Sequence, residues 1–137
     1  MTLSQNGHCN ADWGRADVGD LNSGISQLKR INGNKCSTRG RSCIRTQCHG
    51  NAAIVLCNDN SYTIDVRCTD IARMAEDIRR DCHRVKFPLV CPPFRPCEII
   101  EHSAAGQAFS PGRSWNVIVG SCGKSSHQYF KVLSILA

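Results

Sequence analysis

Apolar side chains recur at helical spacing in two parts of the sequence. The first part follows Asp20, a good N-cap residue, and its apolar stripe consists of Leu21, Ile25 and Leu28. The second part follows Thr69, another N-cap residue, and its apolar face consists of Ile71, Met74, Ala75, Ile78 and Cys82. The pattern therefore predicts one short helix and one longer, more regular helix that ends at Cys82.

Other stretches have the patterns of strands. Residues 52–57 form a continuous apolar run, which is typical of a strand buried on both faces. Residues 62–68 alternate apolar and polar side chains, and they either form a hairpin with that run or lead as extended chain into the second helix. We also expect a short strand at 98–101 and a hairpin between 106–109 and 115–120.

The segments between these elements are rich in turn residues, prolines and cysteines. Residues 34–50 predict a loop with at most one short strand, near Ile44. Residues 83–97 contain Pro88, Pro92, Pro93 and Pro96, so they cannot form a helix. We expect a stiff excursion here, held by Cys91 and Cys97.

The order of these elements predicts a single α+β domain over residues 1–137. We expect an antiparallel sheet of four to five strands, with two helices packed on one face and disulfides that cross-link the domain. Residues 1–17 form an N-terminal arm that Cys9 ties to the body, and residues 123–137 form a C-terminal tail or a last strand.

The cysteine content indicates an oxidising compartment. The number is even, and no pair has the C-x-x-C spacing of zinc ribbons or redox motifs. The sequence therefore predicts a secreted, extracellular protein with up to five disulfides, although the spacing alone leaves their pairing open. The ten residues are Cys9, Cys36, Cys43, Cys48, Cys57, Cys68, Cys82, Cys91, Cys97 and Cys122.

The ends of the chain carry no targeting pattern. Residues 1–8 lack the basic start and apolar core of a secretory signal, so we expect a mature chain. No apolar stretch is long enough to span a bilayer.

The net charge of +6 is concentrated in one part of the sequence. Residues 21–58 contain no acidic side chain, and such a patch favours anionic partners such as cell-wall polymers, lipid headgroups or nucleic acid. Few aromatic residues lie among these cations, which disfavours a specific nucleic-acid surface. The candidate partner-binding residues are Lys35, Arg39, Arg41 and Arg45; the alternative is a solvated basic loop.

The sequence contains no convincing active site. The adjacent pairs Cys48-His49 and Cys82-His83 lack zinc spacing, so we expect no metal and no cofactor. A secreted ribonuclease would need a base, an acid and a phosphate clamp, which Glu98, Glu101, His102 and either Arg39 or Arg41 would have to supply. The simpler interpretation is that these are solvent-facing side chains, and we expect no catalytic residue.

Three motifs in their order carry a family resemblance: G-N-A-A-I-V-L-C at 50–57, C-T-D-I-A-R-M-A-E-D-I-R-R-D-C at 68–82, and W-N-V-I-V at 115–119. The chain resembles small secreted cysteine-rich proteins of plant-associated filamentous fungi, including elicitors of the Trichoderma kind. It is more distantly similar to the α/β-sandwich killer toxins of smut fungi. Gly7-His8-Cys9 only partly matches the amino-terminal motif of these toxins, so their ion-channel activity is not carried over.

The resemblance implies a secreted, non-enzymatic elicitor or effector that recognises a host-plant surface or cell-wall component. One alternative is an antifungal, killer-toxin-like protein acting through the basic loop 35–45, and another is a small secreted hydrolase such as a ribonuclease. A homodimer through a strand edge or the tail at 129–136 is also predicted. We expect the function to lie on segments that flank residues 50–82.

Overall fold

The structure is a computed structural model that describes residues 7–123 of the 137-residue chain. Of the tail predicted at 123–137, residues 124–137 lie outside the described residues. The elements are β1 (Gly7–His8), β2 (Ala16–Asp17), α1 (Val18–Leu28), the 3-10 turn η1 (Asn32–Asn34), β3 (Cys36–Thr38), β4 (Ser42–His49), β5 (Ala52–Asn58), β6 (Ile64–Val66), α2 (Cys68–Asp81), β7 (His83–Lys86), β8 (Glu101–Ala104), β9 (Gly106–Phe109) and β10 (Trp115–Ser121).

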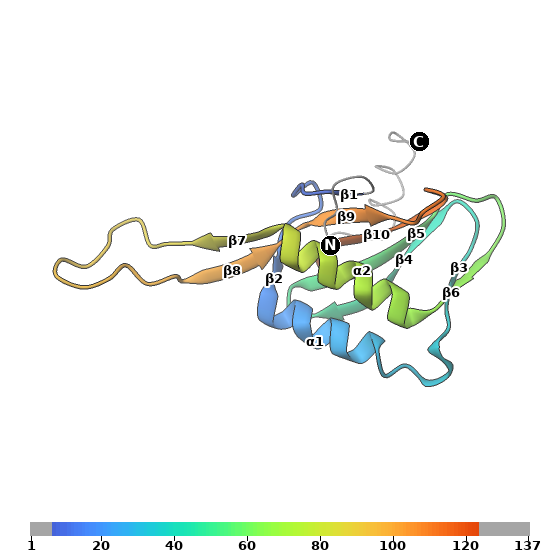
Figure 1. Cartoon of the computed structure of the whole chain (residues 1–137), viewed down its shortest axis with the longest axis horizontal. Helices are drawn as coiled ribbons and strands as arrows, with labels where there is room; N and C mark the ends of the chain where they lie inside the picture. Colours follow the sequence, from blue (N-terminus) through green and yellow to red (C-terminus); the bar gives the residue numbers. More distant parts are fainter. Residues whose placement is uncertain (1–6, 124–137) are drawn as a thin grey trace.

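The body of the protein is a five-stranded antiparallel sheet covered on one face by both helices. The strand order is β1-β9-β10-β5-β4. Figure 1 shows α1 and α2 side by side across this sheet. The predicted α+β architecture is therefore confirmed, and so is the hairpin between 106–109 and 115–120, which is β9 and β10.

Strand β5 forms the centre of the core, as its apolar run predicts. Every residue of β5 is buried, and successive side chains point to opposite faces of the sheet. Ile54 and Leu56 pack beneath the helices, opposite Val119 and Val117 of β10. Val55 belongs to a second cluster on the other face, which contains Trp13 and Ile118.

The prediction of a loop before β5 is wrong, whereas for residues 62–68 the second of the two predicted alternatives, extended chain leading into α2, is confirmed. Residues 34–50 hold two strands, and β4 pairs along β5 over its whole length. β4 is an edge strand with exposed side chains, so its sequence lacks a buried face. Residues 64–66 do not form a hairpin with β5; they pair with β3 and then lead into α2. The buried Asn58 fixes this change of direction, because its side-chain amide donates to the carbonyls of Arg39 and Tyr62.

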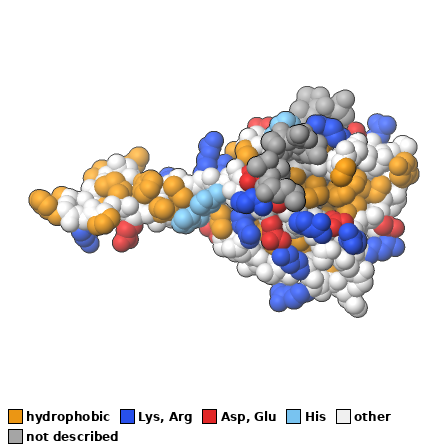
Figure 2. All heavy atoms as spheres, in the orientation of Figure 1, with side chains coloured by type: hydrophobic (Ala, Val, Ile, Leu, Met, Phe, Trp, Pro, Cys, Tyr) orange, Lys and Arg blue, Asp and Glu red, His pale blue; other side chains and the backbone are white. Residues whose placement is uncertain are grey.

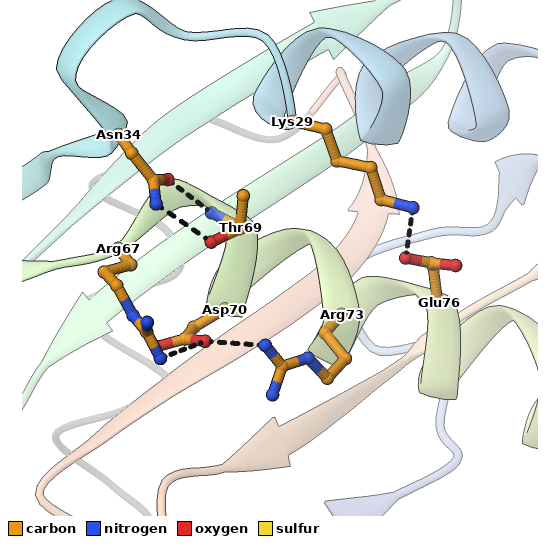
Figure 3. A network of polar contacts seen from close by, with 7 residues as sticks. All are labelled: Lys29, Asn34, Arg67, Thr69, Asp70, Arg73 and Glu76. Carbon is orange, nitrogen blue, oxygen red and sulfur yellow. Dashed lines mark hydrogen bonds and ion pairs between the residues drawn. The ribbon is translucent and has the colours of Figure 1, made fainter.

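The helices begin with different caps from those predicted. The N-cap of α1 is Asp17, whose carboxylate accepts from the N–H of Asp20 at 2.9 Å. α2 begins one residue before Thr69, and its own N-cap has no side-chain hydrogen bond. Asn34 of η1 supplies the missing cap from outside the helix. Its side chain accepts from the Thr69 N–H at 2.9 Å and donates to the Thr69 hydroxyl at 3.1 Å (Figure 3).

Asn34 is expected to stabilise the protein by capping α2. Asn34 has φ of 50°, so Asn34→Gly removes the side chain while keeping a backbone that tolerates this conformation. We expect a loss of about 1 kcal/mol in the free energy of unfolding, measured by urea titration, because both hydrogen bonds to Thr69 are lost. Asn34→Asp keeps the acceptor and serves as the control; an equal loss in both variants would contradict the cap.

All ten cysteines lie within the described residues and form five disulfides. The pairs are Cys9–Cys82, Cys36–Cys68, Cys43–Cys57, Cys48–Cys122 and Cys91–Cys97. The first pair confirms that Cys9 ties the N-terminal segment to the body. Such a set of disulfides fits an extracellular protein.

A separate three-stranded sheet, β2-β8-β7, lies at one end of the body. β7 was not predicted, and the strand expected at 98–101 begins only at Glu101. β8 and β9 are separated only by Ala105, so the chain passes from this sheet directly into the main one. The three-stranded sheet is the base of the feature described next.

Candidate functional site

Residues 83–104 form a long hairpin that projects from the body. We call this hairpin the arm; it consists of β7, β8 and the connection 87–100. Figure 1 shows the arm extending well beyond the helices and the main sheet. Among residues 7–123, the tip therefore lies clear of the body, and its side chains are presented to the surroundings.

The arm carries most of the exposed large apolar side chains. Outside the arm, the described residues include only Ile44 and Tyr62 in this class. At the tip, Leu89 and Phe94 are 103% and 104% exposed. Figure 2 shows apolar atoms along the whole projection. The exposed set on the arm is Val85, Phe87, Leu89, Val90, Phe94, Ile99 and Ile100. Contiguous exposed apolar surface of this kind marks a contact site.

The tip is held in shape by covalent constraints. The Cys91–Cys97 disulfide closes the end of the arm, as predicted for this excursion. Prolines fix φ at four positions of the connection and limit its alternative conformations. Phe94 has φ of 63°, which is rare for a bulky residue, and it lies within the short loop that the Cys91–Cys97 disulfide closes. The apolar side chains are therefore presented on a restricted framework.

The base of the arm is anchored to the body. Arg15 donates to the Ser103 hydroxyl at 2.7 Å and to the Cys82 carbonyl at 3.2 Å, so it links β8, and the residue directly before β7, to the N-terminal segment. Burial, together with the charge of Arg84, lowers the pKa of Arg15, while Glu101 opposes the shift. A Cβ at Gly106 would lie 2.6 Å from the backbone of His8 and 3.1 Å from the Cys82 sulfur. Position 106 therefore has room only for glycine where the strand passes the Cys9–Cys82 disulfide.

The two faces of the arm near its base differ in chemistry. Val85 is paired with His102 and Lys86 with Glu101, and side chains alternate between faces along each strand. One face therefore carries His83, whose ring stacks on His102 with 2.9 Å between ring nitrogens. The other face carries the charged side chains Arg84, Lys86 and Glu101.

This arrangement does not assemble the residues considered for a ribonuclease. Glu101 and His102 are neighbours in β8, so their side chains point to opposite faces. Arg39 and Arg41 follow β3, at the opposite end of the molecule from the arm (Figure 1). The acid, base and phosphate clamp are therefore not brought together.

The basic candidates lie on separate segments. Lys35 precedes β3, with its amine 3.5 Å from the carboxylate of Asp65. Arg39 and Arg41 are exposed in the turn between β3 and β4. Arg45, on β4, donates to the Cys122 carbonyl at 2.9 Å. Exposed cations are ordinary on a protein surface, so this group is a weaker candidate than the apolar arm.

Asp65 has a lowered pKa, first because its carboxylate accepts a hydrogen bond from the Ser37 hydroxyl and then because of the charge of Lys35. We expect Ser37→Ala to raise this pKa toward its ordinary value near 3.8, followed by NMR titration of the carboxyl. Lys35→Met is the matched control and should raise it less; a larger effect of Lys35→Met would contradict this assignment.

Other features of residues 7–123 offer little chemistry. An open hollow of about 480 Å³ lies beside α1, but its lining is polar, with Asn22, Gln27 and His49 among the side chains, whereas ligand sites are mostly apolar. No group of three or more His, Cys, Asp or Glu in this part of the chain is placed to hold a metal ion. No helix among these residues is both long and apolar enough to cross a membrane.

The comparisons with known proteins identify no relative. The chain matches no protein-family model, no curated protein and no solved structure. The functional argument therefore rests on the geometry and chemistry of the arm. In the sequence, the arm is indicated by its proline-rich stretch with two cysteines. Only the fold shows that the apolar side chains of this stretch are exposed.

Proposed function

We propose that this is a secreted, non-enzymatic elicitor or effector that recognises a host-plant surface through its arm. One observation carries the proposal: large apolar side chains that would normally be buried are gathered on a projecting, cross-linked hairpin. Five disulfides support an extracellular site of action. The likeness to fungal elicitors supports a plant host.

Recognition by the arm fits the physical design of the protein. Contact with a target would remove the tip side chains from water, and this release is the main favourable term in association. The disulfide and prolines restrict the free tip, so less conformational freedom is lost on contact. Because its base is anchored, the arm holds the tip at a fixed distance from the body. The globular body therefore does not hinder contact between the tip and its target.

The test is binding of labelled protein to cultured plant cells, with the release of reactive oxygen as the defence readout. We expect the wild-type chain to bind and to trigger the response at micromolar dose. Leu89→Ser combined with Phe94→Ser should lose both effects, because it removes the two most exposed apolar side chains. Tyr62→Ser, which removes an exposed aromatic ring elsewhere, should lose neither.

Two results would overturn this proposal. Full binding and response by the double tip variant would show that the arm is not the recognition surface. Absence of a response to the wild-type chain, together with growth inhibition of fungi that Arg39→Gln and Arg41→Gln abolish, would favour the killer-toxin-like alternative.

A further inference from the structure

The tip offers a target almost no hydrogen-bonding side chain. From Phe87 to Phe94 the residues are Phe, Pro, Leu, Val, Cys, Pro, Pro and Phe, with the cysteine in a disulfide. Protein interfaces usually combine an apolar centre with several hydrogen bonds that fix orientation. Leucine and valine are also under-represented among the residues that dominate protein–protein affinity. This surface is better matched to an apolar medium than to a shaped protein pocket.

The backbone of the tip is also suited to a medium poor in water. An unpaired N–H in hydrocarbon is costly, which normally excludes irregular loops from the bilayer core. Pro88, Pro92, Pro93 and Pro96 have no N–H, so the tip carries fewer donors than other loops of its length. The remaining backbone groups restrict the tip to the boundary between headgroups and acyl chains, where water is still accessible.

A basic residue flanks this apolar stretch at each end. Lys86 directly precedes Phe87, and Arg95 directly follows Phe94. Both are exposed, and with Arg84 they outnumber Glu98 and Glu101 on the arm. The whole chain has a net charge of +6, which also favours approach to a negatively charged surface. An apolar tip bordered by cations is the pattern of a protein segment that sits in an anionic membrane interface.

We propose that the arm binds the surface of a bilayer containing anionic phospholipids. In this arrangement Leu89 and Phe94 contact the acyl chains, while Lys86 and Arg95 contact headgroup phosphates. The body remains outside the membrane, held away by the length of the arm. This inference rests on the proposed function, because it names the class of target that the arm recognises.

The first test is flotation of the full chain with phosphatidylcholine vesicles, with and without phosphatidylserine. We expect the wild-type protein to float with the anionic vesicles and much less with neutral ones. Leu89→Ser combined with Phe94→Ser should reduce the partition coefficient by about a hundredfold, because each apolar side chain contributes about tenfold when buried. Tyr62→Ser is the matched control and should partition like the wild type.

The second test distinguishes the contribution of the arm's cations to vesicle binding from the contribution of the protein's net charge. Lys86→Gln and Arg95→Gln should each weaken binding to anionic vesicles by about fivefold, with little effect on neutral vesicles. Arg39→Gln removes one charge at the opposite end of the molecule and should weaken binding much less. Equal losses in all three variants would contradict the placement of the arm in the headgroup region.

The third test reports insertion directly. Phe94→Trp places an indole at the fully exposed tip, whereas the native Trp13 is buried and the native Trp115 is half-buried on β10 of the body, so the spectrum is compared with that of the wild type under the same conditions. We expect its emission to shift to shorter wavelength on anionic vesicles and to be quenched by lipids brominated in the acyl chains. Binding without shift or quenching would overturn insertion of the tip.

The remaining outcomes distinguish this inference from the proposed function. If plant cells bind the protein through the arm while anionic vesicles do not, the lipid target is overturned and a protein receptor is favoured, but recognition by the arm stands. If light scattering shows a dimer that Leu89→Ser and Phe94→Ser dissolve, the tip binds a second copy and the lipid target is also overturned.

Discussion

Replacing residues 87–100 by the dipeptide Asn-Gly is expected to abolish binding to plant cells and leave the body folded. Lys86 and Glu101 face each other across the arm, so a two-residue turn can join β7 to β8. Asn-Gly favours this kind of hairpin turn. The removed residues contribute little to the core, so the free energy of unfolding should change by less than about 0.5 kcal/mol.

This replacement separates recognition from stability. Binding is measured on cultured cells and stability by urea titration of the same preparation. A chain that keeps its stability and loses binding supports the arm as the recognition surface. A large loss of stability would instead show that the arm is part of the cooperative fold, and preserved binding would assign recognition to the body.

Leu56→Ala is expected to cause the largest loss of stability, about 2–5 kcal/mol. Leu56 is fully buried on β5, and its cross-strand neighbours are Ile44 and Val117. Removing most of its side chain leaves a cavity between the sheet and the helices. Disulfides link the surrounding elements and limit how far these elements can shift to fill the cavity. The loss is measured as the difference in free energy of unfolding by urea titration.

The matched control is Val85→Ala, which shortens an apolar side chain that is 41% exposed on the arm. This change should cost less than about 0.5 kcal/mol, as is usual for surface positions. Similar losses in the two variants would contradict the description of β5 as the centre of the core and of the arm as a separate projection.

The central elements could be predicted from the sequence because their burial pattern is local. The continuous apolar run of β5 and the helical stripe ending at Cys82 each identify an element without knowledge of its neighbours. The hairpin of β9 and β10 was also predicted, because its turn lies between two strand-like stretches. The cysteine count predicted the number of disulfides, but their pairing depends on the fold.

Features that depend on distant partners could not be predicted in this way. The side chain that caps α2 comes from Asn34, which lies 35 positions before Thr69, so local capping patterns pointed to the wrong residue. The sequence of β4 has the pattern of a loop, because an edge strand exposes charged residues such as Arg45 and has no apolar face of its own.

The candidate site, too, could be predicted from the sequence only in part. The prolines and cysteines between 88 and 97 predicted a stiff, cross-linked excursion, and its disulfide is present. The apolar residues within it gave no sign of their exposure, because Leu89 and Phe94 would be core residues in most sequences. Only the position of the arm beyond the body shows that nothing in the described chain covers them.

The most direct measurement of the central claim is hydrogen–deuterium exchange of the full chain, free and bound to plasma-membrane vesicles from plant cells. We predict slower exchange on binding for the amides of residues 85–100, and unchanged exchange for the basic segment 35–45. Protection of residues 35–45 with no change in the arm would contradict recognition through the arm.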